Sequence, residues 1–335
     1  MKKILIITTG GTIGSSVSGG VISVQKNRER FEGFLRECLG GSFSFEVRAL
    51  MDILSENLDK QHWETLANYL LSADLQNYCG VIITHGSDTL SYTSAMMGFC
   101  LCALGVPVVL TAADRVPDDP ASNAADNIRG AAAVIGAVEH GVYTVYRNPS
   151  DKYCSVYLAT RIVEADRVSG CFSSFDGAPF AQVIDGGLVL TEGHSLTETD
   201  SYPQIIPTGG GLSLKNDVLM IRPYPGMDAS CITFGTNTKA VLVISYHSSS
   251  ACTDGRGSIL SLLNECNKRD TGLFLASFPE TDTLYETSFS LLRSGAIPLK
   301  HISDEAAYTK LLLAVNLPVG DIRSFMEKPV FHEYI

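Results

Sequence analysis

The chain has 335 residues, 45% of them hydrophobic and 18% charged, so it can bury a sizeable core, and its length predicts two domains. A net charge of −11 disfavours nucleic acid and anionic membrane surfaces as partners. The nine cysteines lack a disulfide-like spacing, the first apolar run (Ile4 to Ile7) is too short for a secretory signal, and no run approaches a membrane span, which together predict a cytoplasmic protein.

The amino-terminal part of the chain begins with a strand and a glycine-rich turn. Lys3 to Thr8 has the apolar pattern of a buried strand, and Thr9 to Gly14 forms the turn after it. The next stretch, Ser15 to Ser23, is small, polar and aperiodic, which predicts a mobile loop that acts as a lid. A helix over Arg28 to Leu39, a strand over Phe45 to Leu50 and a polar loop over Asp52 to Leu58 follow.

A second polar turn follows a second buried strand. Asp59 is expected to cap a helix, and Val81 to Ile83 then has the β-branched character of a buried strand. This strand ends in the turn Thr84 to Thr89, before a helical pattern that continues to Leu104. Such a turn lies at the carboxyl edge of a parallel sheet, where α/β folds bind ligands. The alternative is that Ser87 and Asp88 in this turn only cap the helix.

The remaining chain continues the alternation of strands and helices. Helices are expected over Asn123 to His140, Ser258 to Lys268, Leu284 to Arg293 and Asp304 to Val315, with strands over Val142 to Tyr146, Tyr153 to Thr160, Val218 to Ile221, Ala240 to Ile244, Leu273 to Ala276 and Ile297 to Leu299. This pattern predicts an α/β fold with mainly parallel sheets: a larger Rossmann-like domain over 1–195, a linker over 196–215 and a smaller domain over 216–335.

The two polar turns carry the chemistry. A hydroxyl on a glycine-rich turn, Thr12, would face a second hydroxyl and a carboxylate, Ser87 and Asp88, if the two strands are neighbours. A hydroxyl nucleophile needs a base, and glycines let backbone amides stabilise an oxyanion, so this arrangement predicts acyl transfer. The alternative, a dinucleotide-binding turn, lacks the G-x-G-x-x-G spacing. No histidine stands at a metal-ligand spacing with another histidine or cysteine, so we expect neither metal nor cofactor.

These motifs resemble those of the bacterial L-asparaginase (asparaginase/glutaminase) family. The turn Thr9 to Gly14 matches the first family signature, and Thr84 to Leu90 matches the second with one change. Further matching segments extend over nearly the whole chain: Ile53 to Leu58, Pro107 to Thr111, Asn123 with Asn127, Arg222 to Gly226, Tyr285 to Thr287 before Gly295, and Glu305 to Leu311. The resemblance implies the asparaginase/glutaminase fold and hydrolysis of the side-chain amide of L-asparagine, glutamine or a related small amide to the acid and ammonia.

The resemblance also implies roles for the residues of the two turns. Thr12 would be the nucleophile that forms the acyl-enzyme. Ser87 stands where the family has its second catalytic threonine, and Asp88 would hold the amino group of the substrate.

Four further residues would bind the substrate if the resemblance holds. Ser55 would contact the substrate carboxylate and Glu56 would lie close to its amino group, while Gly11 and Gly86 would line the site. Family members are homodimers or homotetramers with sites formed between domains of neighbouring subunits. A small amide or amino acid and further copies of this chain are therefore the expected partners.

Three positions depart from the family pattern. Ser87 replaces a threonine and keeps the hydroxyl, whereas the lid tyrosine aligns with Val21, which has no polar group. The lysine of the charged relay beside Asp88 aligns with Glu164. These departures favour an alternative function: a catalytically weakened member that binds an amino acid or amide as a sensor or partner protein.

Overall fold

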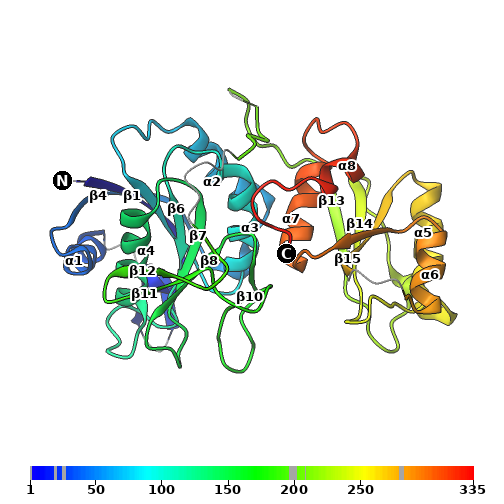
Figure 1. The fold of residues 1–335 in the computed structure, drawn as a ribbon, viewed down its shortest axis with the longest axis horizontal. Helices are drawn as coiled ribbons and strands as arrows, with labels where there is room; N and C mark the ends of the chain where they lie inside the picture. The colour runs from blue at the N-terminus through cyan, green and yellow to red at the C-terminus, as the bar shows by residue number, and fades with distance from the viewer. Residues whose placement is uncertain (1, 19–20, 25–27, 196–201, 208, 279–282) are drawn as a thin grey trace. The chain divides into compact units, whose positions relative to one another are not determined.

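The computed structural model describes residues 2–18, 21–24, 28–195, 202–207, 209–278 and 283–335. The chain divides into two compact units, unit 1 over Met1–Leu212 and unit 2 over Ser213–Ile335 (Figure 1). The division falls inside the segment 196–215, and each unit has its own sheet.

Unit 1 is built on an eight-stranded sheet with the order β12-β11-β8-β7-β6-β5-β1-β4. Its parallel part consists of β1 (Lys2–Gly10), β4 (Phe43–Ile53), β5 (Gly80–Thr84), β6 (Val108–Thr111) and β7 (Val142–Tyr146). The strands β8 (Cys154–Leu158), β11 (Ala181–Ile184) and β12 (Gly187–Leu190) continue it in antiparallel fashion. The central strands are buried along their length, as expected for a parallel sheet covered on both faces.

Two pairs of helices pack on this sheet. In one pair α1 (Arg28–Leu39) contacts α4 (Ala124–Ala137), and in the other α2 (Lys60–Ser72) contacts α3 (Leu90–Leu101). The start of α2 agrees with the sequence, because the Asp59 carboxylate accepts hydrogen bonds from the backbone amides of Gln61 and His62. The end of α3 comes three residues before the expected Leu104, and all but one of its residues are buried.

The order of the strands places a topological switch point next to β1. The chain moves from β1 to β4 on one side, and β5, β6 and β7 then follow on the other side. Ligands of open α/β sheets bind outside the carboxyl ends of the strands at such a point. The turns that follow β1 and β5 therefore occupy the position where a site is expected.

The segment Ser15 to Ser23 is not the irregular loop that its composition predicts. Its described residues form an antiparallel hairpin of β2 (Ser15–Ser18) and β3 (Val21–Val24), with residues 19–20 outside the described part. Backbone hydrogen bonds hold such a hairpin without any apolar alternation, so sequence periodicity could not indicate it. Its role as a lid remains a prediction.

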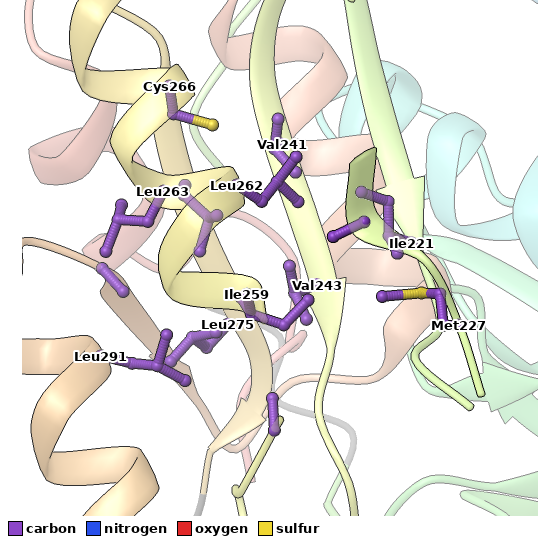
Figure 2. Packing of buried hydrophobic residues seen from close by; sticks show 14 of the residues in the cluster. Ile221, Met227, Val241, Val243, Ile259, Leu262, Leu263, Cys266, Leu275 and Leu291 are labelled. Atoms are coloured by element: carbon purple, nitrogen blue, oxygen red, sulfur yellow. The ribbon is translucent and has the colours of Figure 1, made fainter. Parts of the chain in front are cut away.

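Unit 2 contains a four-stranded, all-parallel sheet of β13 (Asp217–Ile221), β14 (Thr238–Ile244), β15 (Gly272–Phe278) and β16 (Ile297–Lys300). Its helices are α5 (Ile259–Lys268), α6 (Glu286–Arg293), α7 (Asp304–Ala314) and the unexpected short α8 (Ile322–Glu327). Residues of α5 at the spacing of one helix face, Ile259, Leu262, Leu263 and Cys266, are buried in one cluster with β14 and β15 (Figure 2). The second unit thus has a hydrophobic core of its own.

A buried ion pair ties the carboxyl-terminal segment to α7. Lys310 Nζ lies 2.6 Å from Glu333 Oε1, and both side chains are fully buried. The Glu333 carboxylate also accepts hydrogen bonds from the backbone amides of Val330 and Phe331. Burial lowers the pKa of Lys310, and the neighbouring carboxylate opposes this effect. Each charge therefore depends on the other for its stabilisation.

Replacing Lys310 by methionine should destabilise unit 2 strongly. The Glu333 carboxylate would stay buried without its counter-charge, which costs about 3–5 kcal/mol of unfolding free energy. Urea denaturation of the full chain measures this loss. The control is Lys268→Met, which removes an exposed ion pair with Glu265 and should cost at most about 1 kcal/mol. Equal losses in the two variants would contradict the structural role of the buried pair.

Candidate active site

Three turns meet at the carboxyl ends of adjacent parallel strands. β1 lies between β4 and β5, and the register pairs Thr8 with Thr84 and Gly10 with Ile53. The chain leaves β1 in a short 3-10 helix over Thr12–Gly14, and leaves β4 in another over Ser55–Asn57. The turn after β5 contains Ser87 and Asp88. The structure thus brings together the three turns on which all the expected catalytic and substrate-binding residues lie.

Two glycines allow these turns to stack without side chains between them. A Cβ atom on Gly11 would lie 2.5 Å from the carbonyl oxygen of His85 and 2.6 Å from the amide nitrogen of Gly86. Gly11 also has a φ of +78°, a backbone conformation that favours glycine. A Cβ atom on Gly86 would in turn collide with the Ser55 side chain, 2.6 Å from its Cβ. The backbones of the three turns are therefore in direct contact.

The polar side chains of the turns differ in their access to solvent. Thr12 and Ser87 are partly buried, while the carboxylates Glu56 and Asp88 are exposed. Ser55 is only 5% exposed. Two hydroxyls and two carboxylates on stacked turns can offer a nucleophile, proton carriers and a binding place for a cationic amino group.

Helix capping does not account for Ser87 and Asp88. The residue at the amino-terminal cap of α3 is Thr89, whose side chain makes no capping hydrogen bond. Its hydroxyl instead donates to the backbone carbonyl of Ser55 at 2.9 Å, which joins the turn after β5 to the turn after β4. The alternative in which this turn only starts a helix is therefore not supported by the geometry.

A buried hydrogen-bond chain runs from α2 through α3 to the second turn. The indole Nε1 of Trp63 lies 3.0 Å from Thr93 Oγ1, which lies 3.1 Å from His85 Nε2. At the other side of the ring, His85 Nδ1 lies 2.8 Å from the carbonyl oxygen of Gly86. All of these side chains are buried, and no sequence pattern indicated the chain beyond the apolar face that contains Trp63.

This chain selects one neutral form of His85. An indole nitrogen only donates and a carbonyl oxygen only accepts. Trp63 therefore donates to Thr93, the Thr93 hydroxyl donates to Nε2, and the ring proton on Nδ1 is donated to Gly86. Burial lowers the pKa of His85 to about 4. The ring is consequently neutral at physiological pH.

The lowered pKa of His85 predicts a pH dependence of stability. The unfolded chain binds a proton near pH 6.5 that the folded chain refuses until about pH 4, so the contribution is complete above 6.5 and is lost as the pH falls through this interval. The loss approaches about 3 kcal/mol. We expect the difference in unfolding free energy between wild type and His85→Asn, measured by chemical denaturation, to shrink by this amount between pH 7 and pH 4. The exposed His247, replaced in the same way, is the control, and an identical pH slope in both variants would refute the assignment.

Glu164 lies on a separate hairpin on the same side of the sheet. It follows β9 (Ile162–Val163), which pairs with β10 (Ser173–Ser174) so that Val163 faces Ser173. The neighbouring Phe172 donates its amide to the side chain of Asn148, 2.9 Å away and just beyond the carboxyl end of β7. This anchors the hairpin near the edge where the turns lie, and β9 contacts α3. The relay position of Glu164 itself remains a prediction, and the side chain of Val21 lies outside the described part.

Two buried asparagines fix neighbouring loops of the same edge. The Asn127 side chain donates to the Ala112 carbonyl at 2.9 Å and accepts from the Arg147 amide at 2.7 Å. Asn123 exchanges hydrogen bonds with Asp114, at 3.0 Å in each direction. They connect the loop after β6 to the loop after β7, so their role in unit 1 is to hold the edge rather than to bind substrate.

Within the described ranges, no group of three or more histidine, cysteine, aspartate or glutamate residues is arranged to hold a metal ion. The same ranges contain no helix long and apolar enough to cross a membrane.

An α/β sheet with stacked hydroxyl-bearing turns at its switch point defines a protein with a small-ligand site at the carboxyl edge. The family model described as "Asparaginase, N-terminal" matches residues 3–194. This is more than half of the chain, which therefore belongs to the asparaginase family. The family expectation from the two signature turns is confirmed.

Solved structures confirm the two-domain α/β fold. The thermostable L-asparaginase from Thermococcus kodakarensis superimposes with a TM-score of 0.80 at 23% identity, with 99% of each chain covered. L-asparaginase I from Vibrio cholerae gives a TM-score of 0.78 at 20% identity, covering 100% of this chain and 99% of the other.

Curated relatives have a different title. A glutamyl-tRNA(Gln) amidotransferase subunit of Methanopyrus kandleri is 28% identical over 339 residues, covering 94% of this chain and 71% of the relative. The amidotransferase subunit of the same title from Saccharolobus solfataricus is likewise 28% identical over 328 residues, covering 93% and 71%.

Proposed function

We propose that the chain is an amidohydrolase that hydrolyses the side-chain amide of L-asparagine, or of glutamine or a related small amide, through a Thr12 acyl-enzyme. The observation that carries the proposal is the direct stacking of three turns, in which Gly11 touches the His85–Gly86 peptide and Gly86 touches Ser55. This stacking places the hydroxyl-bearing turns next to one another at the switch point of the sheet.

The proposed reaction is a double displacement. The Thr12 hydroxyl attacks the amide carbon and transfers its proton, and the C–N bond breaks to release ammonia and leave an ester on Thr12. Water then attacks the ester, which restores the hydroxyl and releases the acid. The exposed carboxylates Glu56 and Asp88 would hold the ammonium group of the substrate, and Ser55 would contact its carboxylate.

Thr12→Ala should abolish ammonia release from a panel of asparagine, glutamine and related amides. The loss should reach at least about 10³-fold, as for other hydroxyl nucleophiles, while aspartate binding and the unfolding free energy stay near wild type. Thr12→Ser keeps a hydroxyl and is the matched control, for which measurable turnover is expected. Wild-type rates in Thr12→Ala would exclude Thr12 as the nucleophile.

The Glu164→Lys substitution should raise kcat on asparagine. It would restore a cation at the expected relay position beside Asp88, and the gain should be greatest when combined with Val21→Tyr. General acid–base groups contribute about 10²–10⁴-fold, which sets the upper range. Steady-state kinetics measure the change, with the same charge reversal at the exposed Glu192 of unit 1 as the control. If the folded double variant shows no gain over this control, Glu164 does not occupy the relay position.

A second candidate function is favoured by the relatives named as amidotransferase subunits. In an amidotransferase, the nitrogen released from an amide donor passes to an acceptor, so the same Thr12 chemistry would serve transfer instead of hydrolysis. The measurement that separates the two is ammonia release by the chain alone. Hydrolysis requires no acceptor, whereas a transfer subunit would release ammonia efficiently only with its partner.

The sensor alternative and the state of assembly follow from the same experiment. If no amide in the panel yields ammonia in a Thr12-dependent manner while aspartate still binds, the weakened, ligand-binding function applies. We further propose that the chain forms a homodimer or homotetramer in the cytoplasm, as the family resemblance implies.

A further inference from the structure

We propose that His85 is a positioning residue that aims the backbone N–H of Ser87 into the active site, an inference that rests on the proposed amide hydrolysis. The neutral imidazole, held by Thr93 and Trp63, fixes the direction of the Gly86–Ser87 peptide. The argument depends on the geometry of that peptide and on what lies on each side of it.

The carbonyl end of this peptide points to the protein interior. Gly86 O accepts from His85 Nδ1 at 2.8 Å, and the ring is only 1% exposed. In a trans peptide the C=O and the following N–H point in opposite directions. No cis peptide bond occurs in the described part of the chain. The Ser87 N–H therefore points away from the buried ring, toward the side on which partly buried Ser87 meets solvent.

The preceding peptide is fixed as well. Gly11 lies against the His85–Gly86 peptide so closely that a Cβ atom there would be 2.5 Å from its oxygen. The backbone of the turn is therefore held at one peptide by contact with the Thr12 turn and at the next by the imidazole. Since Gly11 directly precedes Thr12, the N–H of Ser87 is fixed relative to the proposed nucleophile.

A backbone N–H at this point has a definite chemical use. The attack of Thr12 on an amide converts the carbonyl oxygen into an oxyanion, which fixed backbone N–H donors stabilise. A donor that cannot rotate is worth more than a mobile one, because no reorganisation is needed in the transition state. Rotation of the Gly86–Ser87 peptide would weaken this stabilisation and would reduce kcat more than substrate binding.

Thr93→Val tests the proposal, because it keeps the shape of the side chain and removes the hydroxyl between Trp63 and His85. The imidazole then loses the partner that selects its tautomer. We expect kcat/KM on the best amide of the panel to fall about ten-fold or more, mainly through kcat. Thr93→Ser returns the hydroxyl and should recover activity to within about three-fold of wild type.

A matched control separates positioning from stability. Thr144→Val removes a buried hydroxyl that donates to Ser94 Oγ of the same helix α3 at 2.7 Å, with no connection to His85. Its unfolding free energy should fall by an amount comparable to that of Thr93→Val, about 1–3 kcal/mol, with kcat unchanged. Equal kcat in the two valine variants overturns the inference.

The outcomes distinguish this inference from the proposed function. Activity in Thr12→Ala would refute the proposed function, whereas an inactive Thr12→Ala together with a fully active Thr93→Val refutes only the role of His85. If Thr93→Val does not fold, Trp63→Phe removes the indole N–H alone and should lower kcat in the same direction. The ¹⁵N NMR shifts of wild-type His85 give a test independent of activity: a proton on Nδ1 at pH 7 supports the inference, and a proton on Nε2 overturns it.

Discussion

The contact between Gly11 and the His85–Gly86 peptide is the constraint on which the geometry of the site depends. Any side chain at Gly11 would occupy space that the backbone after β5 already fills. The parallel pairing of β1 with β5 brings the two chains to this point, and the absence of a Cβ allows them to touch. The positions of Thr12 and Ser87 thus follow from backbone packing, which is stiffer than contact between flexible side chains.

The turn after β4 is held by the same principle together with one hydrogen bond. Gly86 leaves room for Ser55, and the Thr89 hydroxyl donates to the Ser55 carbonyl. Substrate-binding residues placed on a loop would otherwise share the mobility of that loop. Here the loop is a short 3-10 helix pressed against its neighbour, so Ser55 and Glu56 have a fixed starting point on the scaffold.

Much of the architecture could be predicted from local sequence, because parallel strands buried on both faces leave continuous apolar runs such as Ile4 to Ile7. The polar turns were also predictable, since glycines and hydroxyls directly follow those strands. The Trp63–Thr93–His85 chain was not, because it joins residues 30 and 8 positions apart through tertiary packing, and Trp63 only fits an apolar helix face. The hairpin of β9 and β10 escaped for another reason: two-residue strands have no period to detect.

The positions that depart from the family pattern lie outside the stacked turns. Val21 is on β3, and Glu164 follows β9, whereas the stacking involves only the turns after β1, β4 and β5. A change at either position therefore leaves the contact between Gly11 and the second turn intact, along with the neutral imidazole behind it. The nucleophile, the substrate carboxylates and the backbone donors belong to one rigid assembly, while the lid and relay groups are supplied by separate hairpins. Proton transfer can consequently vary in this chain without loss of the geometry that binds the substrate.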